Sequence, residues 1–312
     1  MKYCFGADVG GTTIKLGLFT VDGEILDKWE IITRTENEGE SILQDIATAL
    51  KEKIQEKAIP AEEVIGIGMG IPAPVNSEGI VRKTANLGWG YKEVKKELEN
   101  LTGWQVVVGN DANVAALGEM WKGAGHGEKN MVMVTLGTGV GGGVIMGGRP
   151  LIGANGAGGE IGHICVNYFE EKCCGCGKKG CLEQYASATG IARIAREHLA
   201  ADTKDSILQT YDLDKIDAKI VFEGDQLAVD VVEEFGEYLA KGLADVAVVV
   251  DPSLFVIGGG VSKAGEILLT YIEKYYRKRA FFANKDTQFA IASLGNDAGI
   301  CGAAKLILDS QV

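Results

Sequence analysis

The sequence has few basic residues relative to acidic ones and no long apolar run. Its 312 residues include 31 Lys and Arg against 43 Asp and Glu, a net charge of −12, which argues against binding to nucleic acid or to an anionic membrane surface. The longest apolar runs, such as Val246 to Val250, are far shorter than the roughly 20 residues of a membrane-spanning helix. The first ten residues place Asp8 inside an apolar stretch, unlike a secretory signal. We therefore expect a cytoplasmic protein with a small-molecule partner, no nucleic acid and no membrane.

Proline is also scarce, with 5 residues, whereas glycine is abundant, with 44 residues, about twice its ordinary share of ~7%. With 46% hydrophobic and 24% charged residues the chain is typical of globular proteins, which excludes disorder and coiled coil. Fifteen of the glycines lie between Gly123 and Gly162, among β-branched and apolar runs. This local density indicates a site that needs unhindered backbone rather than a flexible linker.

The pattern of apolar residues predicts two α/β domains. In the first, the expected elements are an antiparallel meander of strands at 3–9, 14–19 and 25–33, a helix at 42–54, strands at 64–70 and 105–109, and helices near 91–100 and 110–121. In the second, they are strands at 131–136, 140–146, 254–257 and 288–294 and helices near 226–250, 262–279 and from 299. Residues 131–146 are expected to form two strands joined by a glycine turn, as are residues 3–19. This similarity is a weak internal repeat. We expect a small lobe over 1–115, with the C-terminal helix at about 299–312 packing on it, and a large lobe over 116–298.

Three glycine motifs are candidates for contact with phosphate, because residues without a Cβ let backbone N–H groups approach an anion. They are Asp8, Gly10, Gly11, Thr12, Thr13 and Lys15 at the first turn; Gly137, Thr138 and Gly139 at the second; and Gly258, Gly259 and Gly260 where a strand gives way to a helix. The alternative for the first motif is an ordinary hairpin, for the second a closely packed strand pair, and for the third a tight turn. For Lys15 the alternative is a solvent-facing position on a strand. The first motif is not the Walker pattern, in which a lysine and a hydroxyl open a helix.

A histidine and a cysteine cluster predict a structural zinc site. His163, Cys174, Cys176 and Cys181 are a suitable tetrahedral set, and the glycines between them allow a short loop to fold around an ion. Cys173 is the spare thiol, although the sequence alone allows Cys173 and Cys174 to be exchanged. The alternatives are a redox pair or reduced surface thiols.

Acidic residues next to these motifs are candidates for binding hydroxyl groups and for catalysis. Glu160 and Glu183 flank the cysteine loop, where carboxylates can accept hydrogen bonds from vicinal hydroxyls, or they are simply solvated loop acids. Asn110 and Asp111 follow a strand and open a helix, so they either cap that helix or place Asp111 as a general base.

Together these residues resemble the ROK family of sugar kinases within the actin-like ATPase superfamily, most closely its bacterial glucokinases. The match covers nearly the whole chain, and the histidine with the cysteine block is its most specific part. The resemblance implies a two-lobed α/β fold of the ribonuclease H-like type with ATP and sugar in the interlobe cleft, and commonly a homodimer. It also implies Asp111 as catalytic base, Asn110, Glu160, His163 and Glu183 as sugar ligands, and zinc on His163 and the three cysteines. Asn86 resembles a family segment near the sugar.

The activity implied by this resemblance is transfer of a phosphoryl group from Mg-ATP to the 6-hydroxyl of glucose, as in the first step of glycolysis. Asp111 would accept the hydroxyl proton and Asp8 would help to place Mg²⁺. The alternatives are a ROK kinase for fructose, mannose, allose or N-acetylmannosamine, a sugar-responsive transcriptional regulator, and a noncatalytic sugar sensor. We expect no regulator, because only seven residues precede Asp8 and leave no room for a DNA-binding helix-turn-helix.

Overall fold

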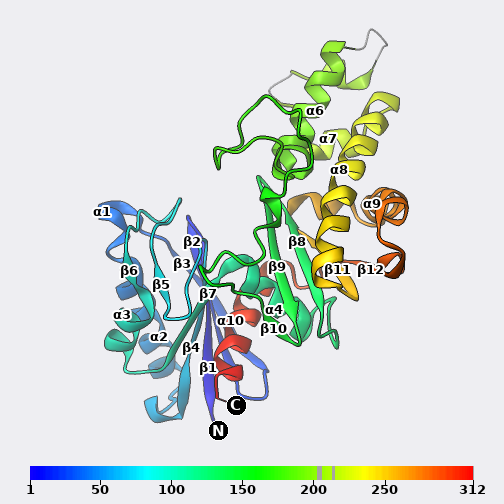
Figure 1. Cartoon of the computed structure of the whole chain (residues 1–312). Coiled ribbons are helices and arrows are strands. Elements are labelled where there is room, and N and C mark those ends of the chain that lie inside the picture. Colours follow the sequence, from blue (N-terminus) through cyan, green and yellow to red (C-terminus); the bar gives the residue numbers. More distant parts are fainter. Residues whose placement is uncertain (202–205, 213–214, 312) are drawn as a thin grey trace. The chain divides into compact units, whose positions relative to one another are not determined.

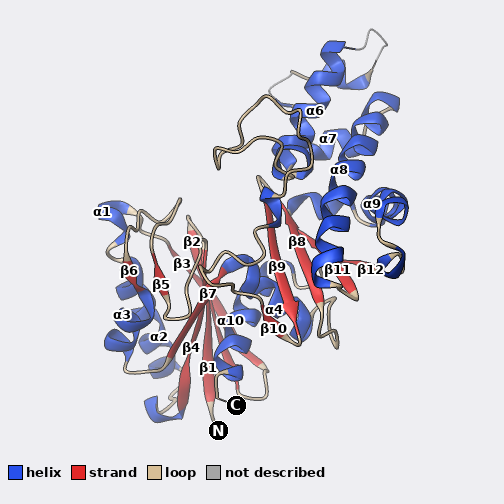
Figure 2. Ribbon diagram, viewed as in Figure 1, coloured by secondary structure: helices blue, strands red, loops and turns tan. Residues whose placement is uncertain are grey.

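The computed structural model describes residues 1–201, 206–212 and 215–311, which form two compact units. The first unit comprises Met1–Lys129, Gly143–Gly159 and Ser293–Val312, of which Val312 lies outside the described residues. The second unit comprises Asn130–Gly142 and Glu160–Ala292. Figure 1 labels most elements of both units, and Figure 2 colours their strands and helices differently.

The first unit is built on a five-stranded sheet of order β3-β2-β1-β4-β7. The strands are β1 (Tyr3–Val9), β2 (Thr13–Thr20), β3 (Ile25–Ile32), β4 (Val64–Ile71) and β7 (Val106–Asn110), with the short pair β5 (Ile80–Val81) and β6 (Lys92–Glu93) beside it. The predicted meander is confirmed, since β1 pairs antiparallel with β2 and β2 with β3. The remaining neighbours, β1 with β4 and β4 with β7, are parallel. The carboxyl ends of β1, β4 and β7 therefore meet at one edge of this sheet.

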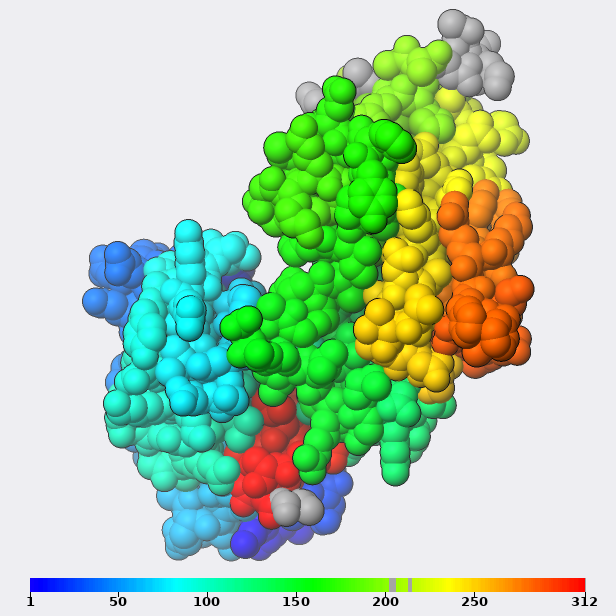
Figure 3. Space-filling model, viewed as in Figure 1, coloured from blue at the N-terminus to red at the C-terminus, as the bar shows by residue number. Residues whose placement is uncertain are grey.

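Helices cover this sheet and share its core. They are α2 (Ile42–Glu56), α3 (Val94–Thr102), α4 (Asp111–Lys122) and α10 (Ala298–Asp309), whereas α1 (Glu36–Gly39) is a short segment that precedes α2. The buried positions of α2, among them Ile42, Ile46 and Leu50, recur at the spacing of one helix face and pack in the main hydrophobic core. α10 packs on β1, β4 and α4 and is the red segment beside the blue N-terminal residues in Figure 3.

The second five-stranded sheet has the order β10-β9-β8-β11-β12. Its strands are β8 (Met131–Leu136), β9 (Val140–Met146), β10 (Arg149–Pro150), β11 (Leu254–Gly258) and β12 (Gln288–Ile291), of which β10 and the end of β9 belong to the first unit. β11 lies parallel to both β8 and β12. Since a glycine hairpin and the strand after it occupy matching places in both sheets, the strand orders support the internal repeat expected from the sequence.

The helices of the second unit are α5 (Glu183–Ala186), α6 (Ala188–Ala201), α7 (Ala218–Phe222), α8 (Gln226–Val250) and α9 (Glu266–Arg279). α8 and α9 pack side by side, as the yellow and orange surfaces of Figure 3 show. Short 3₁₀ segments occur in both units: Ala61–Glu63 and Gly295–Asp297 in the first, and Ile161–His163, Ile207–Thr210, Gly260–Ala264 and Phe282–Asn284 in the second. No helix in the described part of the chain has the length and apolar character needed to cross a membrane.

Several boundaries differ from those expected. The helix expected at 262–279 is wrong at its start, because Gly265 (φ 74°) separates a 3₁₀ segment from α9. The expected helix near 91–100 begins only at Val94, after β6, and the expected strand at 288–294 ends at Ile291. The boundary placed at residue 115 falls inside α4, whereas the first compact unit keeps all of α4 because α10 packs along it.

Candidate functional site

In the first unit, the predicted residues gather at the edge where the parallel strands end. Asp8 lies in β1 opposite Lys15 of β2 and in register with Gly70 of β4. Ile71, the last residue of β4, is in register with Asn110, the last residue of β7. This edge therefore carries the Asp8 carboxylate, the first glycine turn and the Asn110-Asp111 pair, which is the usual place for ligands on a parallel sheet.

Asp8 is held in a tight, half-buried position. A Cβ on Gly299, in the first turn of α10, would lie 2.4 Å from the Asp8 carboxyl carbon, so the carboxylate needs a glycine there. Burial raises the pKa of Asp8 above its ordinary value, and the charge of Lys15 partly offsets this. The Lys15 side chain is half-buried rather than fully exposed.

Asn110 and Asp111 form the amino-terminal end of α4. The Asn110 side-chain oxygen accepts from the backbone N–H groups of Ala112 (3.0 Å) and Asn113 (3.2 Å), and its amide donates to the Asp111 carboxylate (3.0 Å). The same Asp111 oxygen accepts from the Ala112 N–H group at 2.8 Å. The predicted capping role of Asn110 is thus present, and it fixes the Asp111 carboxylate at the positive end of the helix dipole.

Asn113 is a buried polar residue next to this pair that was not predicted from the sequence. It is 4% exposed, its amide donates to the Gly158 carbonyl at 3.4 Å, and its side-chain oxygen has no protein partner in the described structure. It therefore ties α4 to the loop that leads into Glu160. The only sequence feature that could have pointed to Asn113 is its position about one helical turn after Asn110.

Asn86 is exposed and lies beside the first glycine turn. A Cβ on Gly11 would come within 3.2 Å of the Asn86 Cβ, so the glycine allows the two loops to approach. The segment that carries Asn86 is folded by Thr84, whose hydroxyl accepts from the Trp89 N–H group at 3.0 Å.

In the second unit, the other two glycine motifs lie side by side. Gly258 of β11 is in register with Thr135 of β8, so both strands end at the same edge. Gly259 has a φ of 84°, and a Cβ on it would lie 2.5 Å from the Leu136 carbonyl oxygen, which excludes other residues.

A cavity of about 620 Å³ adjoins these motifs in the second unit. Its wall includes Gly260, Ala188, the aromatic ring of Phe222 and the aliphatic side chain of Ile267. This volume and the mixed apolar lining suit a drug-sized or nucleobase-sized ligand. Phe222 and Ile267 were not predicted from the sequence, because a cavity wall has no sequence periodicity of its own.

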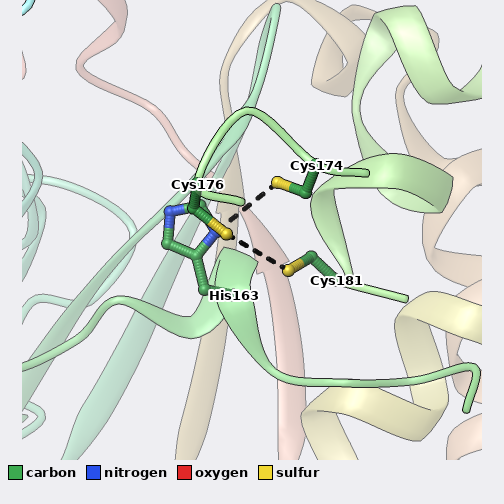
Figure 4. Close-up of side chains that lie close together, drawn as sticks. All are labelled: His163, Cys174, Cys176 and Cys181. Atoms are coloured by element: carbon green, nitrogen blue, oxygen red, sulfur yellow. Dashed lines mark hydrogen bonds between the residues drawn. The ribbon is translucent and has the colours of Figure 1, made fainter. Parts of the chain in front are cut away.

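The four predicted metal ligands come together in the second unit (Figure 4). Their ligand atoms lie within 4.8 Å of one another; Cys174 Sγ is 3.9 Å from His163 Nδ1 and Cys176 Sγ is 3.6 Å from Cys181 Sγ. Cys173 is exposed and outside this cluster, whereas Cys174 is buried within it, which favours Cys174. Burial raises the pKa of Cys181 to about 12 and also raises that of Cys174.

The two acidic neighbours of this cluster are held differently. Glu160 is exposed, with a carboxylate oxygen 4.0 Å from Nε2 of His163, so the imidazole has one nitrogen toward the thiols and the other toward an acid. Glu183 opens α5 and accepts from the Val140 N–H group at 3.0 Å, while its second oxygen lies 3.6 Å from Cys174 Sγ. Glu183 therefore connects the cysteine loop to the second glycine turn, a contact that the sequence did not predict.

Comparison with known proteins gives a consistent assignment. The profile of the ROK family matches residues 4–310. A glucokinase from Halalkalibacterium halodurans is 45% identical over 99% of this chain and 96% of the relative. A ROK family glucokinase from Streptomyces griseus, solved in complex with glucose and AMPPNP, is 36% identical with a TM-score of 0.76 and covers 97% of this chain and 98% of that one. A ROK hexokinase from Thermus thermophilus has a TM-score of 0.83 at 32% identity over 99% of both chains. This chain belongs to the ROK family and has the two-lobed actin-like ATPase fold of that family.

Proposed function

We propose that this protein is a glucokinase, which transfers the terminal phosphoryl group of ATP to the 6-hydroxyl of glucose. The observation that carries the proposal is the Asn110-Asp111 pair, a carboxylate fixed by a helix cap at the ligand-binding edge of the first sheet. Asp111 accepts the proton of the attacking hydroxyl. Glucose is chosen as the sugar because the relative with 45% identity is a glucokinase.

The glycine motifs bind the nucleotide in this proposal. The turns at 10–13 and 137–139 bind the polyphosphate through backbone N–H groups, and the cavity beside Gly260 takes the nucleobase. In a loose transition state most of the catalysis is positioning and neutralisation of charge, so oriented N–H groups contribute more than one cationic side chain. Mg²⁺, when bound near Asp8, neutralises phosphate charge and orients the transferred group.

The hexose is held by a set of hydrogen-bonding side chains, namely Asn86, Asn110, Glu160, His163 and Glu183. An acceptor for each hydroxyl gives specificity, because a buried polar group left unpaired costs about 1–3 kcal/mol. Glu160 and His163 sit next to each other and Glu183 is fixed by the Val140 N–H group, which supports a preformed acceptor set.

His163, Cys174, Cys176 and Cys181 would hold zinc in a structural role. A tetrahedral ion with bonds of about 2.3 Å places its ligand atoms about 3.8 Å apart, and the separations of 3.6 and 3.9 Å fit this geometry. With these four protein ligands such an ion would have no open position for water, and its role would be to hold the loop in place. It would also set the tautomer of His163, whose Nδ1 faces the thiols and whose Nε2 faces Glu160.

We further propose that the protein is a homodimer, as the family resemblance implies, and that it acts in the cytoplasm at the entry of glycolysis. The oligomeric state is tested by light scattering of the purified protein. A mass of one chain over the whole concentration range would refute the dimer.

A coupled assay of ADP release with Mg-ATP over a panel of hexoses tests the main proposal. The panel is glucose, fructose, mannose, allose and N-acetylmannosamine, and glucose is expected to give the highest kcat/KM. No sugar-dependent release would refute the kinase proposal. A higher kcat/KM for N-acetylmannosamine would refute the choice of glucose and favour the kinase for another hexose.

A further inference from the structure

Each of the two glycine turns has a threonine hydroxyl behind it. In the first unit, Thr33 Oγ1 donates to the Gly10 carbonyl at 2.7 Å. In the second unit, Thr189 Oγ1 donates to the Thr138 carbonyl at 2.8 Å. Neither threonine lies in a glycine motif, and they come from different elements: Thr33 directly follows β3, and Thr189 is in the first turn of α6. The same kind of contact thus occurs in both units, whose sheets also have matching strand orders.

The contact in the first turn determines which way its peptides face. Thr33 is 7% exposed and binds the turn twice, since its N–H group also donates to the Thr12 carbonyl at 2.9 Å. In a trans peptide the N–H group points opposite to the carbonyl. With the Gly10 carbonyl directed to Thr33, the N–H group of Gly11 faces the other side, where the described residues offer it no acceptor.

The second turn is held in the same way by a chain of hydrogen bonds. The Gly137 carbonyl accepts from the Ala188 N–H group at 2.8 Å and the Thr138 carbonyl accepts from Thr189. The Thr189 proton is used in that bond, so the contact of 2.9 Å between Thr189 and Ser187 has Ser187 as donor. Ser187 Oγ in turn accepts from the Gly190 N–H group at 3.0 Å. The N–H groups of Thr138 and Gly139 consequently face away from α6, again without an acceptor among the described residues.

We propose that Thr33 and Thr189 are positioning residues for phosphate binding, which orient the N–H groups of Gly11 and Gly139 toward the polyphosphate. The inference rests on the proposed kinase function. Peptides next to glycine rotate at little steric cost, so a glycine turn alone does not select one orientation. A hydroxyl donor on the carbonyl side selects the orientation in advance, and the ligand then does not bear the cost of ordering the turn.

The test replaces each threonine with the nearly isosteric valine, in which a methyl group takes the place of the hydroxyl. Binding of Mg-ADP to the zinc-loaded protein is measured by calorimetry without sugar. Thr33→Val and Thr189→Val are each expected to raise the Kd about fivefold, the equivalent of about 1 kcal/mol for one neutral hydrogen bond. Because the two residues share no hydrogen bond, the double variant is expected to show about a 25-fold increase.

Two controls distinguish an effect on the orientation of the turn from a general loss of stability. Thr33→Ser and Thr189→Ser keep the hydroxyl and are expected to restore the affinity for Mg-ADP to within twofold of the unaltered protein. Thr287 matches Thr33 in burial, at 7% exposed, and its hydroxyl donates to the Asn284 carbonyl at 2.9 Å. Thr287→Val is expected to lower the melting temperature without changing the Kd for Mg-ADP.

In turnover, the KM for ATP is expected to rise in both valine variants while the Kd for glucose stays within twofold. Valine variants that bind Mg-ADP as tightly as the unaltered protein would overturn the inference, as would serine variants as weak as the valine ones. Absence of Mg-ADP binding by the unaltered protein is a different result, because it would overturn the proposed function itself.

Discussion

The carboxylate of Glu183 connects two parts of the second unit, and its removal is expected to weaken nucleotide binding as well as sugar binding. One oxygen accepts from the Val140 N–H group at 3.0 Å, at the end of the second glycine turn, and the other lies 3.6 Å from Cys174 Sγ. The turn is fitted to this carboxylate, since a Cβ on Gly139 would lie 2.1 Å from it. Glu183→Ala therefore leaves one side of the turn without support.

The magnitude follows from the type of hydrogen bond that is lost. A bond to a charged acceptor contributes about 1.5–3 kcal/mol, and the half-buried position of Glu183 favours the lower end of that range. The expected result is a Kd for Mg-ADP raised by about tenfold. Calorimetric titration without sugar measures this directly, and the Kd for glucose is measured separately.

Glu160→Ala is the matched control, because Glu160 is the other acid beside the cysteine loop and lies 4.0 Å from the imidazole of His163. It is expected to weaken glucose binding and to leave the Kd for Mg-ADP unchanged. If Glu183→Ala and Glu160→Ala had the same effect on Mg-ADP, the connection through Val140 would be refuted. Unchanged Mg-ADP affinity in Glu183→Ala would refute it as well.

Three further predictions concern the catalytic base, the metal and the charge of Asp8. Asp111→Asn is expected to lower kcat by about 10²–10⁴-fold in the coupled assay. The affinities for glucose and Mg-ADP are expected to stay within a few fold, since an asparagine oxygen still accepts from the Ala112 N–H group. Near-normal turnover would exclude Asp111 as the base. A strong zinc chelator is expected to lower the melting temperature and the glucose affinity together, because the metal would fix His163, and an unchanged melting curve would contradict this site. Burial raises the pKa of Asp8, so its ionised form costs stability above the folded-state pKa, and this cost falls as the pH is lowered toward the ordinary value of 3.8. Asp8→Asn is thus expected to raise the melting temperature more at pH 8 than at pH 4, measured by scanning calorimetry, while lowering kcat; a lower melting temperature at pH 8 would show that the loss of the Lys15 partner dominates.

Local sequence patterns were sufficient for most of the secondary structure. The apolar and β-branched runs of β1 and β2, which are buried on both faces, and the helical spacing in α2, which buries one face, are signals that act over a few residues. The start of α9 was missed because Gly265 adopts a φ of 74°, which no periodicity reveals. The boundary between the units was also not predictable from local patterns, since it depends on α10 packing beside α4, almost 200 residues earlier in the chain.

The sequence by itself determined the types of chemistry available to this protein: glycine turns that admit phosphate, a histidine and thiols of metal-binding spacing, and acids beside them. Only the tertiary structure decided which residues act together. It placed Cys174 rather than Cys173 in the thiol cluster, linked Glu183 to Val140, and put Thr33 and Thr189 behind the turns. Each of these contacts depends on residues that are far apart in the chain or on the direction in which the fold orients a side chain. Residue type and spacing specify what a group can do, whereas the direction in which it points is set by packing and hydrogen bonds from other elements.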